Sequence, residues 1–323
     1  MSDNVVHLII IGGGCAGLTN ATWSGRSGIS TIVFTSGKCE LSSMISTTSI
    51  VENFSTHTTI EGKELIKRMK KQAKLYGARI IEKCIVKVDF SNRPFKVYDC
   101  DGIEYKSSSI LISTGSIPNR LNIENEDKLW GKYISTCVTC DGKFFKSKRV
   151  IILGGGDSAI EEALSISRFT NKITLIHRRN TFRASVVLQK RLFSHSKIKV
   201  MCDYTITKFN VDDKEKLISV ICKNGKDRKE TELKVDAVFY ALGFTPNTKL
   251  FEGIIEMDKS GYIIRKDTDN FESSTSIKGV FCAGDCAVGK YKQAMVAAAD
   301  GTRSSLDINK FLHDVHILED EEF

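Results

Sequence analysis

Two stretches of the chain repeat one pattern of apolar and small residues. Residues 5–17 (VVHLIIIGGGCAG) and 149–159 (RVIILGGGDSA) both run from an apolar, β-rich segment through three glycines into small residues. Short apolar runs bounded by glycine are typical of buried strands. An expected helix and a second β-rich run follow each stretch, at 18–26 and 30–34 in the first case and at 160–168 and 172–176 in the second.

The repeat continues further along both halves. Apolar strands are expected within 110–119 (ILISTGSIPN) and 237–247 (AVFYALGFTPN), and both segments end in Gly-x-x-Pro-Asn. This match aligns Gly115 with Gly243 without a gap. The duplicated order of strand, glycine turn, helix and strand predicts an α/β fold with two Rossmann-like, three-layer dinucleotide-binding domains.

The glycine turns themselves indicate nucleotide binding. The first turn reads G-x-G-x-x-G and the second reads G-x-G-x-x-A, as in dinucleotide-binding fingerprints. A Cβ in such a turn would keep the backbone away from a pyrophosphate, and the helix that follows offers free N–H groups to that anion. Glycine turns that only pack a helix against a strand are the alternative, but the duplication favours binding. The motif residues are Gly12, Gly14 and Gly17 in the first turn and Gly154, Gly156 and Ala159 in the second.

A basic block follows the second strand of the second half. Residues 177–183 read HRRNTFR, so His177, Arg178, Arg179 and Arg183 lie where this fold contacts the adenosine ribose. Guanidinium groups there favour the 2′-phosphate of NADP, whereas an acid favours NAD. The block predicts that the second domain binds NADPH, and a solvated basic loop is the alternative. Residues 34–37 (FTSG), at the matching place in the first half, carry neither acid nor base.

A second small-residue turn lies near the end of the chain. Residues 280–285 (VFCAGD) place Asp285 on this turn, and residues 293–299 (QAMVAAA) predict an alanine-rich helix just after it. A carboxylate in this position suits a diol, and the start of the helix could lie under a flavin ring. The alternative is an ordinary strand, turn and helix of the core.

One pair among the ten cysteines has the spacing of a redox motif. Cys137 and Cys140 are three positions apart and can close a small disulfide ring, with Asp141 next to them as a proton carrier. A metal site would need a second ligand pair, and Cys282 and Cys286 lie in the glycine turn, so no metal is expected. The other eight cysteines are expected to be reduced, packed thiols.

Composition and charge narrow the class of protein. The length of 323 residues suggests two domains, and 47 basic against 39 acidic residues leave a net charge of +8. Basic residues are not interleaved with aromatic ones, so no nucleic acid is expected as a partner. The apolar run at 5–11 is much shorter than the ~20 residues of a membrane span, and residues 1–4 lack the basic flank of a signal peptide. We therefore expect no membrane association and a cytoplasmic location.

Taken together, these motifs resemble the low-molecular-weight type of thioredoxin reductase over about residues 5–310. The most specific of them are the hexapeptide CVTCDG and the block HRRNTFR. The resemblance also rests on residues 12–17, 51–54 (VENF), 113–115 (STG), 154–163 (GGGDSAIEEA), 243–247, 284–285 and 293–294.

The resemblance implies a domain plan and two cofactors. A discontinuous FAD-binding domain would comprise residues 1–117 plus 246–323, and an NADPH-binding domain, residues 118–245, would be inserted into it and carry the Cys137–Cys140 pair. The implied FAD contacts are Gly12, Gly14, Gly17, Asn53, Thr114, Gly115, Gly284, Asp285, Gln293 and Ala294. The implied NADPH contacts are Gly154, Gly156, Asp157, Ser158, Ala159, His177, Arg178, Arg179 and Arg183.

The resemblance further implies an electron path and an assembly. Electrons would pass from NADPH through FAD to the Cys137–Cys140 disulfide and then to thioredoxin, with Cys140 facing the flavin and Cys137 attacking the substrate. Asp141 would be the acid–base group, and the chain would form a homodimer. Because dithiol and nicotinamide would share one flavin face, a domain rotation is expected about the crossover segments at 115–119 and 243–247.

Some residues depart from the family pattern around the flavin. Residues 42–45 read SSMI where the family has Gly-Gly-Gln-Leu, and Cys15 replaces a proline. Ser55 and Thr56 replace Pro-Gly, and Lys292 replaces an arginine. Two other functions stay open: reduction of a different dithiol protein or a small disulfide, and a nucleotide-sensing scaffold without chemistry. The intact Cys137, Cys140 and Asp141 argue against the scaffold.

Overall fold

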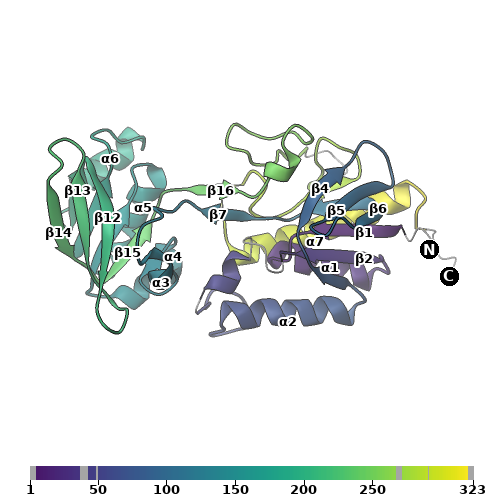
Figure 1. Cartoon of the computed structure of the whole chain (residues 1–323), viewed down its shortest axis with the longest axis horizontal. Helices are drawn as coiled ribbons and strands as arrows, with labels where there is room; N and C mark the ends of the chain where they lie inside the picture. Colours follow the sequence, from purple (N-terminus) through teal and green to yellow (C-terminus); the bar gives the residue numbers. More distant parts are fainter. Residues whose placement is uncertain (1–4, 37–42, 49, 267–270, 290, 319–323) are drawn as a thin grey trace. The chain divides into compact units, whose positions relative to one another are not determined.

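The computed structural model describes residues 5–36, 43–48, 50–266, 271–289 and 291–318. The chain forms two compact units (Figure 1). Unit 1 comprises Met1–Ile117 and Thr245–Phe323, and unit 2 comprises Pro118–Phe244. Unit 2 is therefore an insertion in the sequence of unit 1.

Unit 1 is built on a seven-stranded sheet with the order β3-β2-β1-β6-β5-β4, in which β17 also pairs with β6. Strands β1, β2, β3, β6 and β17 are parallel, and the ribbon of β4 and β5 is antiparallel. The strands are β1 Val6–Ile11, β2 Thr31–Thr35, β3 Arg79–Glu82, β4 Ile85–Asp89, β5 Phe95–Asp99, β6 Glu104–Ile112 and β17 Val280–Cys282.

Two apolar layers cover the faces of this sheet. Helices α1 Cys15–Arg26, α2 Gly62–Leu75 and α7 Ala294–Asp314 lie along one face, where Leu8 and Ile10 of β1 are fully buried. On the other face, Ile9 and Ile11 pack in a core with Phe90 of the ribbon region. The short 3-10 helices η1 Met44–Thr47 and η3 Lys249–Phe251 complete the unit. Because both faces are covered, β1 is apolar at every position from Leu8 onward.

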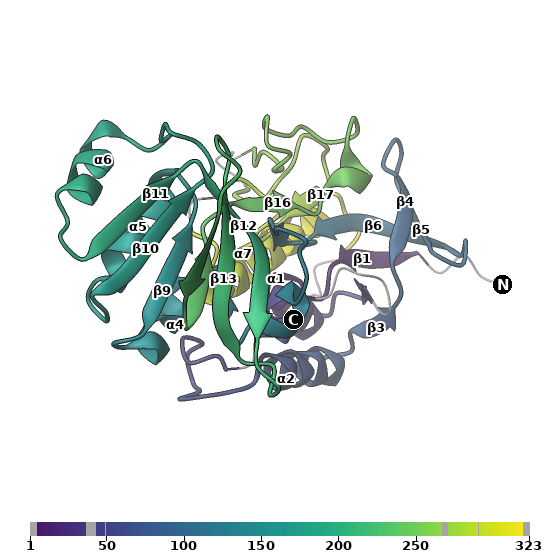
Figure 2. The same cartoon turned by 60° about the vertical axis from the view of Figure 1, so that its left-hand side comes forward.

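Unit 2 repeats the three-layer plan with a five-stranded parallel sheet of order β11-β10-β9-β15-β8. One face packs against α5 and α6, and the other packs against an antiparallel sheet of β12, β13 and β14. Figure 2 shows α6 beside β11. The elements are β8 Ile134–Ser135, β9 Arg149–Leu153, β10 Lys172–His177, β11 Ile198–Cys202, β12 Tyr204–Val211, β13 Leu217–Asn224, β14 Glu230–Lys234, β15 Ala237–Tyr240, α3 Glu126–Leu129, α4 Val138–Asp141, η2 Gly142–Phe145, α5 Asp157–Ile166 and α6 Val186–Phe193.

The predicted α/β fold with two Rossmann-like units is confirmed. Both units open with strand, glycine turn, helix and parallel strand, β1-α1-β2 and β9-α5-β10. The helix bounds differ from expectation, since α1 begins at Cys15 and α5 at Asp157, immediately after the third glycine of each turn. The predicted starts at 18 and 160 were wrong because the small residues after the turn already form the first helical turn.

The two crossover segments pair with each other. Strands β7 Ser116–Pro118 and β16 Phe244–Pro246 form a two-stranded sheet (Figure 1). Gly115 and Gly243, aligned in the sequence repeat, have φ of +69° and +87°, a backbone region that favours glycine. The carbonyl of Gly115 accepts a hydrogen bond from the N–H of Asn247, and that of Gly243 accepts one from Asn119, both at 2.9 Å. The matched glycines and asparagines therefore make equivalent bonds at the two ends of this ribbon.

No helix in the described part of the chain is long and apolar enough to cross a membrane.

A paired carboxylate ties two neighbouring strands of unit 2 together and gives a prediction for pH. Asp236 accepts hydrogen bonds from Arg149 Nε at 3.0 Å and Arg149 Nη2 at 2.8 Å, just before β15 and at the start of β9. The Arg149 guanidinium lowers the pKa of Asp236 to about 2. Because this value lies below the usual ~3.9, the pair stabilises the fold at higher pH and loses that effect as pH falls through about 2.

We expect Asp236→Asn to lower the free energy of unfolding by about 1 kcal/mol at neutral pH, since the half-exposed arginine is partly screened by solvent. The difference from wild type should shrink as pH falls from ~4 toward ~2. Denaturant unfolding at several pH values measures this, with the exposed loop aspartate variant Asp213→Asn as control. A difference that stays constant over that range would contradict the assignment.

Candidate active site

The glycine turn of unit 1 brings three backbone segments into close contact. A Cβ on Gly12 would lie 2.2 Å from the carbonyl oxygen of Ser113, and one on Gly17 would lie 2.0 Å from that of Gly12. In contrast, a Cβ on Gly14 would meet, among the described residues, only Ser43 Oγ, at 3.6 Å. Gly14 is the N-cap of α1, and no side-chain cap bond is made there by the described residues. Gly12 and Gly17 are thus needed for the close packing of the turn, whereas the absence of a side chain at Gly14 leaves the start of α1 accessible to a ligand.

A buried hydroxyl beside this turn supports a polar ligand. Thr35 ends β2, and its Oγ1 is buried without a hydrogen-bond partner among the described residues. Gly13 lies against Thr35, since a Cβ there would approach Thr35 Cγ2 to 2.3 Å. An orphaned donor next to uncapped helical N–H groups suits the ribose and pyrophosphate of a dinucleotide.

The C-terminal segment lies next to the start of α1 in the same unit. Gly284 has φ of +76°, and its N–H donates to Asp300 Oδ2 at 3.2 Å. A Cβ on Gly301 would lie 2.2 Å from the carbonyl oxygen of Ala16, so α7 is packed directly on the first turn of α1. Burial raises the pKa of Asp285, and the ammonium of Lys292 opposes that shift. Asp285 is therefore a half-buried carboxylate on a fixed turn.

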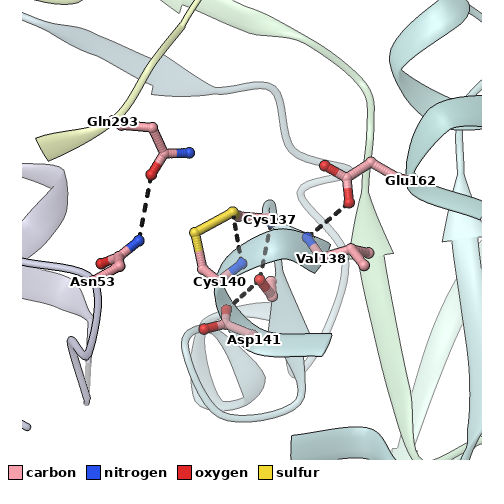
Figure 3. Close-up of a disulfide and its surroundings, with 8 residues drawn as sticks. Asn53, Cys137, Val138, Cys140, Asp141, Glu162 and Gln293 are labelled. Atoms are coloured by element: carbon pink, nitrogen blue, oxygen red, sulfur yellow. Dashed lines mark hydrogen bonds between the residues drawn. A yellow bond between two sulfur atoms is a disulfide. The ribbon is translucent and has the colours of Figure 1, made fainter. Parts of the chain in front are cut away.

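Other predicted flavin contacts belong to the same unit. Asn53 Nδ2 donates to Gln293 Oε1 at 3.4 Å (Figure 3), and Gln293 is the N-cap of α7, which begins at Ala294. The carbonyl of Thr114 accepts a hydrogen bond from Asn247 Nδ2 at 3.0 Å. Of the residues that depart from the family pattern, Ser42 lies outside the described residues.

The glycine turn of unit 2 has the same division of roles. A Cβ on Gly154 would lie 2.5 Å from the carbonyl oxygen of Ala241, whereas a Cβ on Gly156 would have no neighbour within 4 Å in the part of the chain that the structure describes. Gly156 is the N-cap of α5. Asp157 and Ser158 are exposed in the first turn of this helix, and Ala159 is buried against Gly154. The open Gly156 is the counterpart of Gly14.

The basic block surrounds a buried histidine. The ring of His177 lies where a Cβ on Gly155 would be, and it stacks on Phe182 with ring centroids 5.0 Å apart. Burial lowers the pKa of His177, and Arg179, Arg178 and Arg183 add to that effect. The three guanidinium side chains are exposed, and Arg183 N donates to the carbonyl of Gly155 at 2.9 Å. The three arginines thus act on His177, whose ring lies against the glycine turn, and the backbone of Arg183 bonds to that turn.

The redox pair forms a disulfide at the start of a single helical turn. Cys137 and Cys140 are bonded, with Cα atoms 5.3 Å apart, and Cys137 is the N-cap of α4 (Figure 3). Ser135 Oγ donates to Asp141 Oδ2 at 2.5 Å and accepts from the N–H of Cys137 at 3.1 Å. The Asp141 carboxylate therefore reaches the backbone of Cys137 through one hydroxyl group.

Two residues of this site were not predicted. Ser135 lies two positions before Cys137 and is the last residue of β8. A hydroxyl at the end of a short strand is the only sequence signal for it. Glu162, from α5, accepts a hydrogen bond from the N–H of Val138 at 2.7 Å. Glu162 lies within the segment GGGDSAIEEA, but its contact joins residues 24 positions apart.

The remaining cysteines only partly match expectation. Burial raises the pKa of Cys15 and of Cys222 to about 12, so these thiols are unreactive. Cys282 and Cys286 are also buried and free, whereas Cys100 is exposed. Cys84 is disulfide-bonded, so the prediction that it is a reduced thiol was wrong. That prediction rested on the expected cytoplasmic location, in which cysteines are kept reduced. The sequence alone does not show which cysteines the fold brings together.

The comparisons with known proteins agree with this arrangement. The family model for pyridine nucleotide-disulphide oxidoreductases matches residues 6–301. A thioredoxin reductase of Rickettsia conorii is 40% identical over 308 residues, which is 95% of this chain and 98% of that protein. One of Streptomyces coelicolor is 37% identical over 313 residues, 97% of this chain and 95% of that protein. The solved thioredoxin reductase of Giardia duodenalis has a TM-score of 0.88 at 36% identity and covers 95% of this chain and 99% of that one.

Two dinucleotide-binding turns and a redox disulfide thus define a disulfide oxidoreductase that uses a flavin and a pyridine nucleotide. Within that class, the chain belongs to the thioredoxin reductase family.

Gly17 is tightly packed in the first turn and Gly14 is not, and this difference gives a prediction. We expect Gly17→Ala to lower the free energy of unfolding by about 2 kcal/mol or more, because the Cβ would push against the carbonyl of Gly12. Gly14→Ala should leave the stability of the flavin-free protein within about 0.5 kcal/mol, because among the described residues its Cβ meets only Ser43 Oγ at ordinary contact distance. It should weaken flavin binding, because that Cβ occupies the helix start to which a pyrophosphate would bind.

Chemical denaturation and fluorescence titration with FAD separate the two effects. Equal destabilisation by both substitutions, or unchanged flavin affinity in Gly14→Ala, would contradict this division of roles.

Proposed function

We propose that this chain is an NADPH-dependent thioredoxin-disulfide reductase that holds FAD in unit 1 and NADPH in unit 2. The observation that carries the proposal is the Cys137–Cys140 disulfide on α4, with Asp141 linked to it through Ser135. The relatedness to thioredoxin reductases over nearly the whole chain supports thioredoxin as the acceptor.

The residues of unit 1 fit FAD. The open start of α1 at Gly14 and the orphaned hydroxyl of Thr35 suit its pyrophosphate and ribose. Gly284 and Asp285 would hold the ribityl chain, and Gln293 and Ala294 at the start of α7 would face the ring. Bound FAD would supply the electron relay between NADPH and the disulfide.

Unit 2 fits NADPH. The start of α5 at Gly156 takes the pyrophosphate, and the exposed arginines at the end of β10 bind the 2′-phosphate. A guanidinium group offers paired N–H donors that match the oxygens of a phosphate. A ribose hydroxyl does not need such paired donors.

The reduced pair passes electrons on by thiol–disulfide exchange. The Cys137 thiolate attacks one sulfur of the thioredoxin disulfide, forming a mixed disulfide and releasing the first thioredoxin thiolate. The Cys140 thiolate then attacks Cys137 Sγ, which reforms the Cys137–Cys140 disulfide and releases the second thiolate. Asp141 moves the protons, taking them from the attacking thiols and giving them to the leaving sulfurs. The enzyme dithiol is oxidised and the thioredoxin disulfide is reduced by one electron pair.

The chain works as a homodimer, as the resemblance implies, and in the cytoplasm, the location expected from its sequence. The paired crossover strands β7 and β16 are the proposed hinge about which one unit turns between successive steps.

The arginine block gives a test of nucleotide choice. We expect Arg178→Ala together with Arg183→Ala to raise the KM for NADPH by about tenfold or more, because charge-assisted bonds to the 2′-phosphate are lost. The KM for NADH should change little. Arg168→Ala, an exposed arginine just beyond the end of α5, is the matched control. An unchanged KM for NADPH in the double variant would show that this loop does not bind the phosphate.

The dithiol gives a test of the acceptor step. Cys137→Ser and Cys140→Ser should each abolish NADPH oxidation coupled to thioredoxin, because exchange needs both thiols. Cys100→Ser, which removes an exposed thiol, is the control and should keep full activity. Thioredoxin reduction that survives in both active-site variants would refute the mechanism. A wild-type protein that reduces only small disulfides would favour the alternative acceptor.

A further inference from the structure

A carboxylate from the nucleotide-binding helix caps the helical turn that carries the disulfide. Glu162 lies in the second turn of α5, and its Oε2 accepts a hydrogen bond from Val138 N at 2.7 Å (Figure 3). Val138 directly follows Cys137, and its side chain is fully buried. Without Glu162, this buried N–H would lose its acceptor, since the first N–H groups of a helix have no partner within it.

The helical turn that bears the disulfide needs such outside support. Helix α4 has four residues, too few to be stable by themselves. Inside the turn, Cys137 Sγ accepts from the N–H of Cys140 at 3.1 Å, and the carbonyl of Cys137 accepts from the N–H of Asp141 at 3.1 Å. The bond to Glu162 comes from a separate helix, so it fixes the turn against the body of unit 2.

The same helix also presents the nucleotide-binding turn. Helix α5 begins right after Gly156 and carries Glu162 near its middle. Its apolar face, with Ile160 and Ala163, packs in one core cluster with Val138. A ten-residue element thus joins the proposed pyrophosphate site to the backbone of the redox pair.

Two neighbouring carboxylates carry the same charge as Glu162. Burial raises its pKa, the charges of Glu161 and Asp141 raise it further, and the N–H of Val138 opposes them. The carboxylates of Asp141 on α4 and Glu161 on α5 therefore act on Glu162, which lies where an ionised group is costly.

We propose that Glu162 is a positioning residue of the redox site, which holds Cys137 and Cys140 at bonding distance by anchoring α4 to α5 through the N–H of Val138. This inference rests on the proposed function, since it assigns a role to the same disulfide. A looser turn would lower the effective concentration of one thiol toward the other and so make the disulfide easier to reduce.

The thiol–disulfide equilibrium of the holoenzyme tests this role. The protein is equilibrated in dithiothreitol redox buffers at one fixed pH that is the same for all variants. After acid quenching and alkylation, mass spectrometry gives the oxidised fraction of the peptide that contains Cys137 and Cys140. We expect Glu162→Ala to lower the equilibrium constant for disulfide formation about threefold or more. Glu162→Gln keeps an acceptor oxygen and should stay within about twofold of wild type.

The controls separate positioning from general stability. Glu161→Ala removes the neighbouring carboxylate, which lies on an exposed position, and should leave the equilibrium constant unchanged. If Glu162→Ala does not fold, Glu162→Asp keeps the charge on a side chain one methylene shorter and should give a smaller decrease. An equilibrium constant equal to or above that of wild type, in whichever of the two variants folds, would overturn the inference. Failure of the proposed function would appear differently, as a wild-type protein that does not reduce thioredoxin.

Discussion

Close contact between a strand end, a glycine turn and a helix start is the constraint on which both units depend. In unit 1, Gly17 allows α1 to approach the carbonyl of Gly12, and Gly12 in turn lies against Ser113 of the neighbouring strand end. In unit 2, Gly154 and Ala159 make the same kind of contact next to Ala241. Among the described residues, no Cβ position at Gly14 or Gly156 comes closer than 3.6 Å to another atom, so each helix start stays open to an anion. The proposed binding of two different dinucleotides therefore follows from one local geometry used twice.

Helix α4 meets a different constraint, because a helix of only four residues has to hold its N-cap Cys137 next to Cys140. Such a turn has too few internal hydrogen bonds to persist alone. Ser135 and Asp141 support it from within the local segment, and Glu162 supports it from α5. The disulfide is thus part of unit 2 in structure as well as in sequence.

Sequence reasoning predicted the features that depend on a local pattern of residues. Glycine spacing predicted both turns, the CxxC spacing predicted the disulfide, and the basic block after β10 predicted a cluster of arginines. Contacts between distant residues were missed, such as Glu162 with Val138 and Asp300 with Gly284, because they depend on how helices pack on sheets. Cys84 shows the same limit, since its oxidation depends on which cysteine the fold brings to it. His177 was predicted as a ligand contact, and that stays a prediction; its ring is buried and lies where a Cβ on Gly155 would be.

The central claim is that one chain passes electrons from NADPH to a flavin and on to the Cys137–Cys140 disulfide. Anaerobic titration of the FAD-loaded protein with NADPH, followed by flavin absorbance, measures how many electron pairs the chain accepts. The account predicts about two pairs for wild type, one for the flavin and one for the disulfide, and about one pair for Cys137→Ser with Cys140→Ser. Equal uptake by the wild type and the double variant would contradict it.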